Sequence, residues 1–286
     1  MVLHLCTIKL KIFRMKTITT TVAFFFIVMV SAQEFTGKAI YKTNRKSGIN
    51  IGGKSTMSDV QKKNIEERMR KMNQKTFILE FDKSTSTYKQ EAKLNAPQPK
   101  ASGGIMMRIS SGGNSIYYKN IKEKRFANKT SIMGKVFLIK DSLPNYDWQL
   151  SSETKNIGSY TCYKATLSKE IDKTNVELVD GKLKSVKKKV TINTTAWYTP
   201  QVPVNNGPST FHGLPGLILE INDGTTTMVC TEIILNPSDK NKIEEPEKGK
   251  VVNQAKYNEI SAQKEKEMLE RFRSKDGKGI EINIGG

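Results

Sequence analysis

The stretch LILEINDGTTTMVCTEII, residues 217–234, indicates the fold class of this 286-residue chain. Residues 217–222 and 226–234 are rich in the aliphatic and β-branched side chains that strands favour. Asp223-Gly224 stands between them, and this dipeptide is the strongest short signal for a tight turn between antiparallel strands. The stretch therefore predicts a β-hairpin.

Strand-like runs recur at short intervals upstream of this hairpin. They cover residues 35–44, 76–81, 85–90, 105–109, 115–120, 124–129, 135–140, 148–153, 158–168, 175–179, 183–193 and 195–198. Turn-forming residues such as Gly112-Gly113 and Pro144-Asn145 separate them. Many short strands with frequent turns predict a mainly β (α+β) fold, with a curved antiparallel sheet or half-open barrel over residues 33–237.

Two helices are expected beside the sheet. Ser58 and Gln61 have the spacing of a capping box, which predicts a helix over residues 58–74. Its apolar stripe is expected to pack on the sheet; a partner helix or a membrane surface is the alternative. Residues 238–286 are interpreted as a charged linker, a peripheral helix over 255–273 and a tail or short edge strand.

The first 32 residues have the pattern of a secretory signal peptide, with Met15 as the expected start. Lys16 precedes Val22–Val30, an uninterrupted apolar run of nine residues, and small residues follow at Val30-Ser31-Ala32. Nine residues are too few for a membrane-spanning helix, which needs about 20. We therefore expect an exported protein without a transmembrane segment in the mature chain.

The chain is basic, with 47 Lys and Arg against 28 Asp and Glu. Loss of residues 1–32 would remove four basic residues and no acidic ones, and would leave a basic chain. The densest basic run, KLKSVKKK at 182–189, contains no aromatic side chain. Solvation of sheet edges and loops is the ordinary explanation of these lysines, and polyanion binding is an alternative. Nucleic acid is not an expected partner of an exported protein.

His and Cys are scarce, with 2 and 3 in the chain, and His4 and Cys6 lie in the predicted signal segment. The remainder, His212, Cys162 and Cys230, excludes His-rich zinc sites, zinc ribbons and iron–sulfur clusters, so no metal or other cofactor is expected. In an oxidising compartment Cys162 and Cys230 could form a disulfide. Two separate buried thiols are the alternative.

No catalytic residues can be assigned from the sequence. A Ser or Cys nucleophile requires a base, and His212 is the only His after residue 32. The chain has no nucleophile-elbow, zinc-protease, phosphate-loop or calcium-loop motif. Carboxylates are available at Asp141, Asp147, Glu153 and Glu220. If Asp147, Glu153, Glu220 and His212 converge on one cleft, an enzyme is favoured; if they are scattered, a binding protein is favoured.

The most distinctive segment is WYTPQVPVNNGPSTFHGLPGLILEI, residues 197–221. Pro200, Pro203 and Pro208 fix backbone φ and remove amide donors, while the glycines of the segment permit tight turns and close backbone approach. A rigid irregular loop that leads into a core strand is therefore predicted. Nearby aromatic side chains could line a groove, and core packing is the alternative. The candidate binding residues are Trp148, Trp197, Tyr198, Phe211 and His212.

The string Gly213-Leu214-Pro215-Gly216-Leu217-Ile218 resembles the signature of the GLPGLI family of exported bacterial proteins. The stretches 137–141, 146–150, 153–158, 160–166 and 197–203 also resemble segments of that family. The resemblance extends over roughly residues 35–235. The lysine-rich insert 167–196 and the tail after residue 238 depart from it.

The resemblance implies a periplasmic or secreted protein of a Gram-negative envelope, with a curved antiparallel sheet and an unassigned biochemical role. These patterns favour a non-enzymatic envelope protein that binds an apolar or peptide-like ligand or docks on an outer-membrane partner. The alternatives are a carboxylate-dependent hydrolase of envelope or extracellular polymer, and a basic polyanion-binding protein. The signature loop itself is interpreted as architectural.

Overall fold

The computed structural model describes residues 35–46, 60, 67, 73–91, 115–179, 182–238 and 243–275. Within these ranges, the side chains of residues 173–187, 265 and 268–275 are not described. The predicted signal peptide, nearly all of the predicted helix 58–74 and the predicted strand 105–109 lie outside the described residues. All the elements below belong to one unit, residues 36–286.

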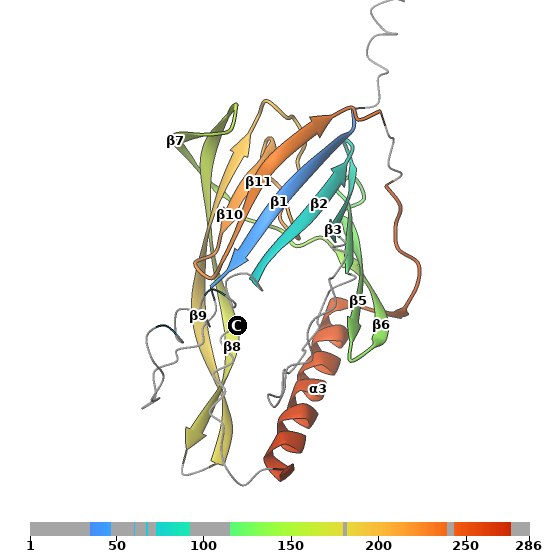
Figure 1. The fold of residues 1–286 in the computed structure, drawn as a ribbon, viewed down its shortest axis with the longest axis vertical. Helices are drawn as coiled ribbons and strands as arrows, with labels where there is room; N and C mark the ends of the chain where they lie inside the picture. Colours follow the sequence, from blue (N-terminus) through green and yellow to red (C-terminus); the bar gives the residue numbers. More distant parts are fainter. Residues whose placement is uncertain are drawn as a thin grey trace, which may run out of the picture. The chain divides into compact units, whose positions relative to one another are not determined.

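Twelve strands of the described ranges form one sheet (Figure 1). They are β1 (Gly37–Arg45), β2 (Gln74–Phe81), β3 (Thr85–Gln90), β4 (Ile116–Asn120), β5 (Arg125–Ile132), β6 (Lys135–Ser142), β7 (Gln149–Ile157), β8 (Tyr160–Val179), β9 (Lys182–Thr199), β10 (Leu217–Asn222), β11 (Thr226–Leu235) and β12 (Lys250–Val252). The helix α3 (Gln254–Lys275) follows β12. The mainly β class is confirmed, and the sheet is not closed into a barrel.

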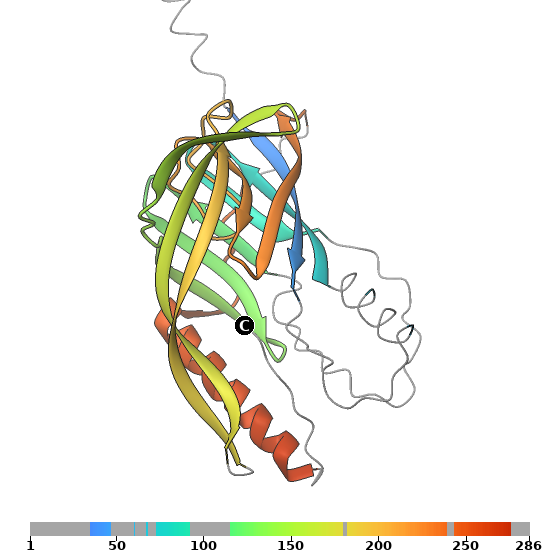
Figure 2. The same cartoon turned by 90° about the vertical axis from the view of Figure 1, so that its left-hand side faces the viewer.

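The order of strands in the sheet is β12-β6-β5-β4-β3-β2-β1-β11-β10-β9-β8-β7. Two meanders, β2–β6 and β7–β11, therefore lie on either side of β1, and Figures 1 and 2 show the curvature of the sheet that they form. Neighbouring strands are antiparallel, except that β12 is parallel to β6. We call the face that carries Tyr41, Lys119 and Phe137 the inner face.

The hairpin predicted from residues 217–234 is confirmed as β10–β11, with Glu220 opposite Val229. The Asp223 carboxylate accepts hydrogen bonds from the backbone N–H groups of Thr225 (2.9 Å) and Thr226 (2.6 Å). Gly224 has a φ of +86°, which glycine adopts without steric cost. The turn is thus stabilised by its own two residues, which is why it could be recognised locally.

Strands β8 and β9 differ from the prediction, which divided this region into four short strands. They run for 20 and 18 residues and pair continuously from Tyr163–Tyr198 to Val179–Lys182. No Gly or Pro interrupts either strand, so nothing in the chain ends the pairing early. Among the described residues, their distal halves pair only with each other, so most of the lysine-rich insert 167–196 forms a two-stranded ribbon (Figure 2).

Within the part of the chain that the structure describes, two clusters of buried side chains belong to the core. The first joins β8–β10 to the irregular segments 143–148 and 200–216, and consists of Ala165, Ala196, Tyr198, Leu214, Ile218 and Ile221, with Trp148, Phe211 and Met228 packed against it. The second lies on the face of β4–β6 opposite the inner face, and consists of Tyr118, Ala127 and Leu138, with Ile243 packed against it. The region β4–β6 is therefore covered on both faces.

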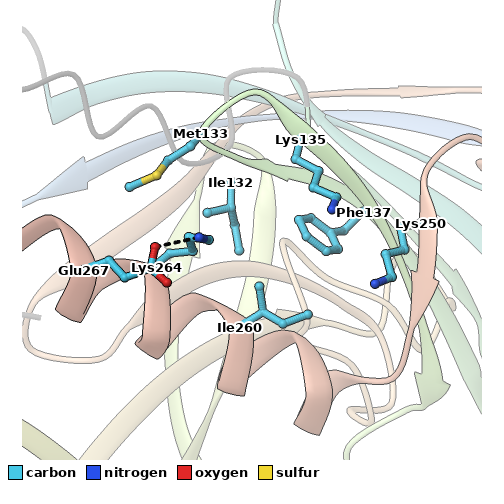
Figure 3. A pocket seen from close by; sticks show the side chains of 8 residues that line it. All are labelled: Ile132, Met133, Lys135, Phe137, Lys250, Ile260, Lys264 and Glu267. Atoms are coloured by element: carbon cyan, nitrogen blue, oxygen red, sulfur yellow. Dashed lines mark hydrogen bonds and ion pairs between the residues drawn. The ribbon is translucent and has the colours of Figure 1, made fainter.

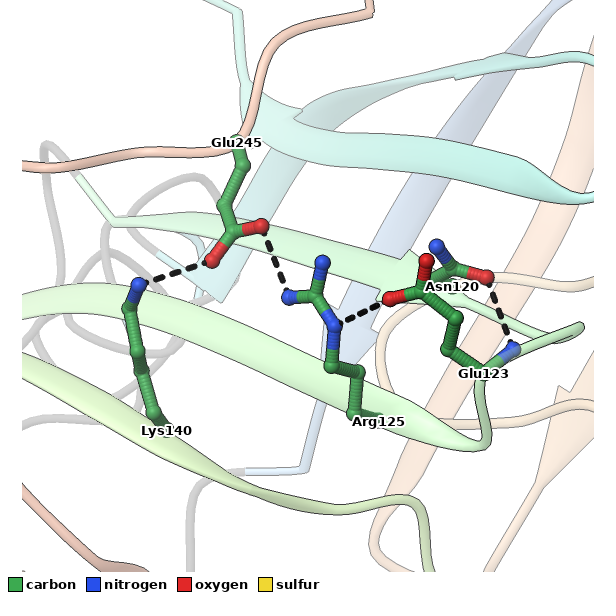
Figure 4. A network of polar contacts seen from close by, with 5 residues as sticks. All are labelled: Asn120, Glu123, Arg125, Lys140 and Glu245. Atoms are coloured by element: carbon green, nitrogen blue, oxygen red, sulfur yellow. Dashed lines mark hydrogen bonds and ion pairs between the residues drawn. The ribbon is translucent and has the colours of Figure 1, made fainter.

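Residues 243–248 are docked on the sheet, although the sequence suggested a linker there. Glu245 forms ion pairs with Arg125 (2.7 Å) and Lys140 (3.0 Å), and Arg125 also pairs with Glu123 (Figure 4). Burial opposes the charged form of Glu245, but hydrogen bonds from Arg125 and Lys140 outweigh it and lower its pKa. This network holds the segment that leads into β12 and α3.

Candidate ligand-binding site

We call the irregular residues 200–216 the signature segment. A buried lysine on the distant strand β4 holds this segment in place. Lys119 on β4 is 0% exposed, and its ammonium group donates to the carbonyl oxygens of Gly207 (2.7 Å), Ser209 (3.0 Å) and Phe211 (2.9 Å). Three acceptors match the three donors of an ammonium group. Burial lowers the pKa of Lys119 well below its ordinary value. Lys119 could not be recognised from the sequence, because a lysine within a strand normally faces solvent.

The family-like string forms the end of this segment and the start of β10. Leu214, Leu217 and Ile218 are buried, whereas Gly213 and Pro215 are exposed. The N–H of Leu217 donates to the carbonyl of Val202 (3.0 Å), and the N–H of Ile218 donates to that of Asn206 (3.0 Å). The backbone of the segment is therefore closed on itself, which supports an architectural role.

Three of the five candidate aromatic and histidine side chains meet in one packed group. Trp148 donates from Nε1 to the carbonyl of His212 (2.9 Å), and the Tyr146 ring lies 5.7 Å from Phe211 and 5.3 Å from His212, centroid to centroid. Tyr198 belongs to the core cluster on which Trp148 and Phe211 pack. Burial lowers the pKa of His212, against a smaller opposing effect of its contact with the Thr210 carbonyl. The group joins segments 143–148 and 200–216.

Successive residues of a strand face opposite sides of the sheet. Tyr198 faces the core cluster, so the neighbouring Trp197 faces the other side and lies apart from this group. The ammonium of Lys155 lies 4.4 Å from the centroid of the Trp197 ring. The same ammonium pairs with Glu220 at 2.7 Å. Trp197 is thus part of a charged surface of β7, β9 and β10.

The four groups proposed as a test of enzymatic function have separate surroundings. Glu220 pairs with Lys155, and the exposed Glu153 on β7 pairs with Lys164 on β8 (2.9 Å). His212 packs on Tyr146, and Asp147 is exposed. Within the described ranges, no group of three or more His, Cys, Asp or Glu side chains is placed to hold a metal ion. No described helix is both long and apolar enough to cross a bilayer.

Cys162 and Cys230 are separate free thiols, so the structure contains the second of the two alternatives left open by the sequence. Both are buried, and burial raises the pKa of Cys162 to about 11 and that of Cys230 to about 12. Thiols that stay protonated and buried react slowly, since the thiolate is the nucleophile.

We therefore expect a chain that starts at Gln33 to show almost no reaction with Ellman's reagent when native and two reactive thiols after unfolding in urea. The reason is burial of both sulfur atoms. Dithiothreitol should leave the melting temperature unchanged, since there is no bond to reduce. A fall in melting temperature on reduction would show that the two sulfurs are joined.

A cavity of about 510 Å³ lies between the β5–β6 hairpin, β12 and α3 (Figure 3). It is lined by Ile132, Met133, Lys135, Phe137, Lys250, Ile260, Lys264 and Glu267. Figure 3 shows Ile132 and Ile260 pointing toward one another across the cavity, with the Phe137 ring beside them. Ligand sites commonly have volumes of about 300–1,000 Å³.

The β5–β6 turn positions one wall of the cavity. Met133 and Gly134 both have positive φ, +48° and +82°, as in the two-residue turns that suit the twist of a hairpin. The turn places Ile132 opposite Lys135, and Phe137 lies two residues further along the same face of β6. Met133 at the tip is 64% exposed, so this end of the wall is open to solvent.

Helix α3 forms the other wall, and its start is fixed by two caps. The Asn253 side chain accepts the N–H of Lys256 (2.8 Å), and Asp141 on β6 accepts the N–H of Gln254 (3.0 Å). Hydrogen bonds from the Gln254 and Ser142 N–H groups lower the pKa of Asp141. Tyr257 then packs edge-on against Phe137, with ring centroids 5.8 Å apart, which brings Ile260 over the hairpin one turn later.

The lining combines apolar and cationic side chains. Lys264 pairs with Glu267 at 2.6 Å. For Lys135 and Lys250, no hydrogen bond or ion pair to any described residue is observed. A peripheral helix over residues 255–273 was predicted from the sequence, but the cavity was not.

Two crystal structures of PNGF-II, in space groups C2 and P21, are similar to this chain, with TM-scores of 0.46 and 0.44 and sequence identities of 15% and 14%. Each match covers 79% of this chain and 32% of the PNGF-II chain, so this chain spans about a third of the length of that protein. No curated protein matches the sequence.

A family model matches residues 148–220, a range that includes Trp148 and the Gly213–Ile218 string. The family is described as a protein of unknown function (Porph_ging). The GLPGLI family is not named in this match, so the resemblance to it stays a prediction. Over residues 148–220, the chain is thus similar to a bacterial family whose function is unknown.

Proposed function

We propose that this protein is an exported, non-enzymatic binding module that holds a ligand with an apolar part in the cavity between the β5–β6 hairpin and α3. The observation that carries the proposal is the cavity itself, with a volume of about 510 Å³ and Ile132, Phe137 and Ile260 in its wall. Concave sites of this size with an apolar lining are the usual form of small-ligand sites. The signal-like residues 1–32 support the exported location.

The placement of the acidic groups supports a binding role over a hydrolase. Two carboxyl groups on either side of one bond are required for most glycoside hydrolysis. Here Glu153 and Glu220 each accept from a different lysine, and neither is associated with His212 or Asp147 in the described structure. The polyanion alternative rests on the basic run 182–189, in which the side chains of 182–187 are not described.

Replacement of Ile260 by glutamine tests the proposal. The neutral fluorescent probe N-phenyl-1-naphthylamine should bind the wild-type protein, and Ile260→Gln should raise its dissociation constant by roughly threefold to tenfold. The reason is loss of about 1 kcal/mol of apolar contact in the cavity wall. Fluorescence titration measures the constant, and circular dichroism checks the fold.

Val251→Gln is the matched control, because Val251 is on β12 next to Lys250, is 62% exposed and does not line the cavity. It removes a similar apolar side chain and should leave probe binding unchanged. An equal rise in the dissociation constant of the probe in both variants, or no probe binding to the wild type, would contradict the proposal.

A further inference from the structure

We infer that the cavity takes an anionic amphiphile: an unbranched acyl or alkyl chain that ends in a carboxylate or a phosphate. This inference rests on the binding function proposed above and names the chemical class of the ligand. It is carried by the geometry of Lys135, Lys250 and Phe137 on one side of the cavity and by the composition of the whole lining.

The two lysines lie on the same face of the sheet as the Phe137 ring. Lys135 precedes Phe137 by two residues on β6, and Lys250 is the residue directly beside Phe137 on the parallel strand β12. Side chains at these positions leave the sheet on one side. Figure 3 shows the Phe137 ring between Lys135 and Lys250, so two ammonium groups flank one apolar surface.

The charges around the cavity are not balanced. Its lining contains three lysines and one carboxylate, Glu267, which pairs with Lys264. Lys135 and Lys250 remain, and the described structure shows no anionic partner for either one. Two neighbouring cations beside an apolar wall attract an anion and repel a cation.

The lack of amide and hydroxyl side chains in the lining favours an acyl chain over a peptide as the ligand. None of the eight lining residues is Asn, Gln, Ser, Thr, Tyr or His, so no side chain among them offers an amide or hydroxyl group. A buried peptide bond without a hydrogen-bond partner costs about 1–3 kcal/mol. A hydrocarbon chain has no such requirement, and its charged end needs only the ammonium groups.

The test uses isothermal titration of the full protein with four ligands that share a twelve-carbon chain: dodecanoate, dodecyl phosphate, dodecanol and dodecyltrimethylammonium. Dodecanoate and dodecyl phosphate should bind at least about fivefold more tightly than dodecanol, and the cation most weakly. Octanoate and decanoate should bind progressively more weakly than dodecanoate, by about fourfold for each methylene that enters the cavity. Inorganic phosphate and acetate alone should show no binding.

The double variant Lys135→Gln, Lys250→Gln should lose the preference for the anion while it still binds dodecanol like the wild type. The expected loss is about fivefold to tenfold for dodecanoate and should shrink at high salt, since exposed ammonium groups are screened. The control Lys122→Gln, Lys129→Gln removes the same charge. Lys122 lies in the β4–β5 turn and Lys129 on the opposite face of β5, so dodecanoate binding should not change.

A second arm distinguishes a free acid from a membrane lipid as the source of the anionic chain. Retention on phosphatidylglycerol vesicles that is lost in the lysine double variant assigns a lipid headgroup. Dodecanoate binding without vesicle retention assigns the free acid. If dodecanol binds as tightly as dodecanoate and the double variant changes nothing, the inference is overturned while the binding function stands. If no twelve-carbon ligand and no naphthylamine probe binds, the binding function itself fails.

Discussion

Replacement of Lys119 by methionine is expected to lower the free energy of unfolding by about 3–5 kcal/mol, because three backbone acceptors lose their donor. Methionine has a similar length but no donors, so the carbonyl groups of Gly207, Ser209 and Phe211 would lose the ammonium group that they share. A buried acceptor without its partner costs about 1–3 kcal/mol. The three losses fall on one short segment, which is expected to loosen as a unit.

Urea unfolding followed by tryptophan fluorescence measures this effect, because Trp148 packs against the same segment. Lys129→Met is the matched control: Lys129 is in the neighbouring strand β5, is only half-buried and should change stability by less than about 0.5 kcal/mol. A loss of under 1 kcal/mol in Lys119→Met would show that the segment keeps its position without the ammonium group.

Replacement of Gly216 by valine should be at least as damaging, with a loss of more than about 3 kcal/mol and a low yield of folded protein. A Cβ at this position would lie 2.2 Å from the carbonyl oxygen and 2.5 Å from the carbonyl carbon of Thr199, well inside contact distance. The φ of +152° is also one that residues other than glycine rarely adopt. The backbone at Thr199 and at residue 216 itself would have to move to relieve this overlap.

Gly224→Ala separates the two causes of the loss expected at Gly216, which are steric overlap and an unfavourable φ. Gly224 has a φ of +86°, but no heavy atom lies within 4 Å of a Cβ built there, so only backbone strain of about 1 kcal/mol is expected. Thermal unfolding of both variants gives the comparison. If Gly216→Val melts at the wild-type temperature, the close approach to Thr199 does not constrain the fold. If it folds normally but loses ligand binding, the signature string has a functional role.

Local signals explain what could be predicted of the fold. The β10–β11 hairpin was recognisable because Asp223 and Gly224 supply the turn by themselves. The peripheral helix predicted over residues 255–273 lies within α3, Gln254–Lys275. By contrast, the lengths of β8 and β9 were underestimated, because β-branched and charged residues mixed along a strand give no clear end point.

The features that could not be predicted from the sequence depend on pairing between segments that are far apart in the chain. Lys119 is indistinguishable in a strand pattern from a solvent-facing lysine, since only the fold brings the carbonyl of Gly207 to it. The cavity likewise requires β12 to pair with β6, which places Lys250 beside Phe137 although 113 positions separate them. Nothing in the local sequence of either strand specifies the other.

The position of β1 between the two meanders affects the order in which the sheet can assemble. Gly37 pairs with Leu235 at the end of β11, so one edge of β1 stays unpaired until residues 226–235 have been synthesised. An unpaired edge of this kind is a template for association with other chains. Pairings between such distant segments also form slowly, because closing a long loop costs entropy before any contact is gained. Until β11 has formed, β1 therefore gives a newly made chain an edge for aggregation, and a chaperone that covers this edge would protect it.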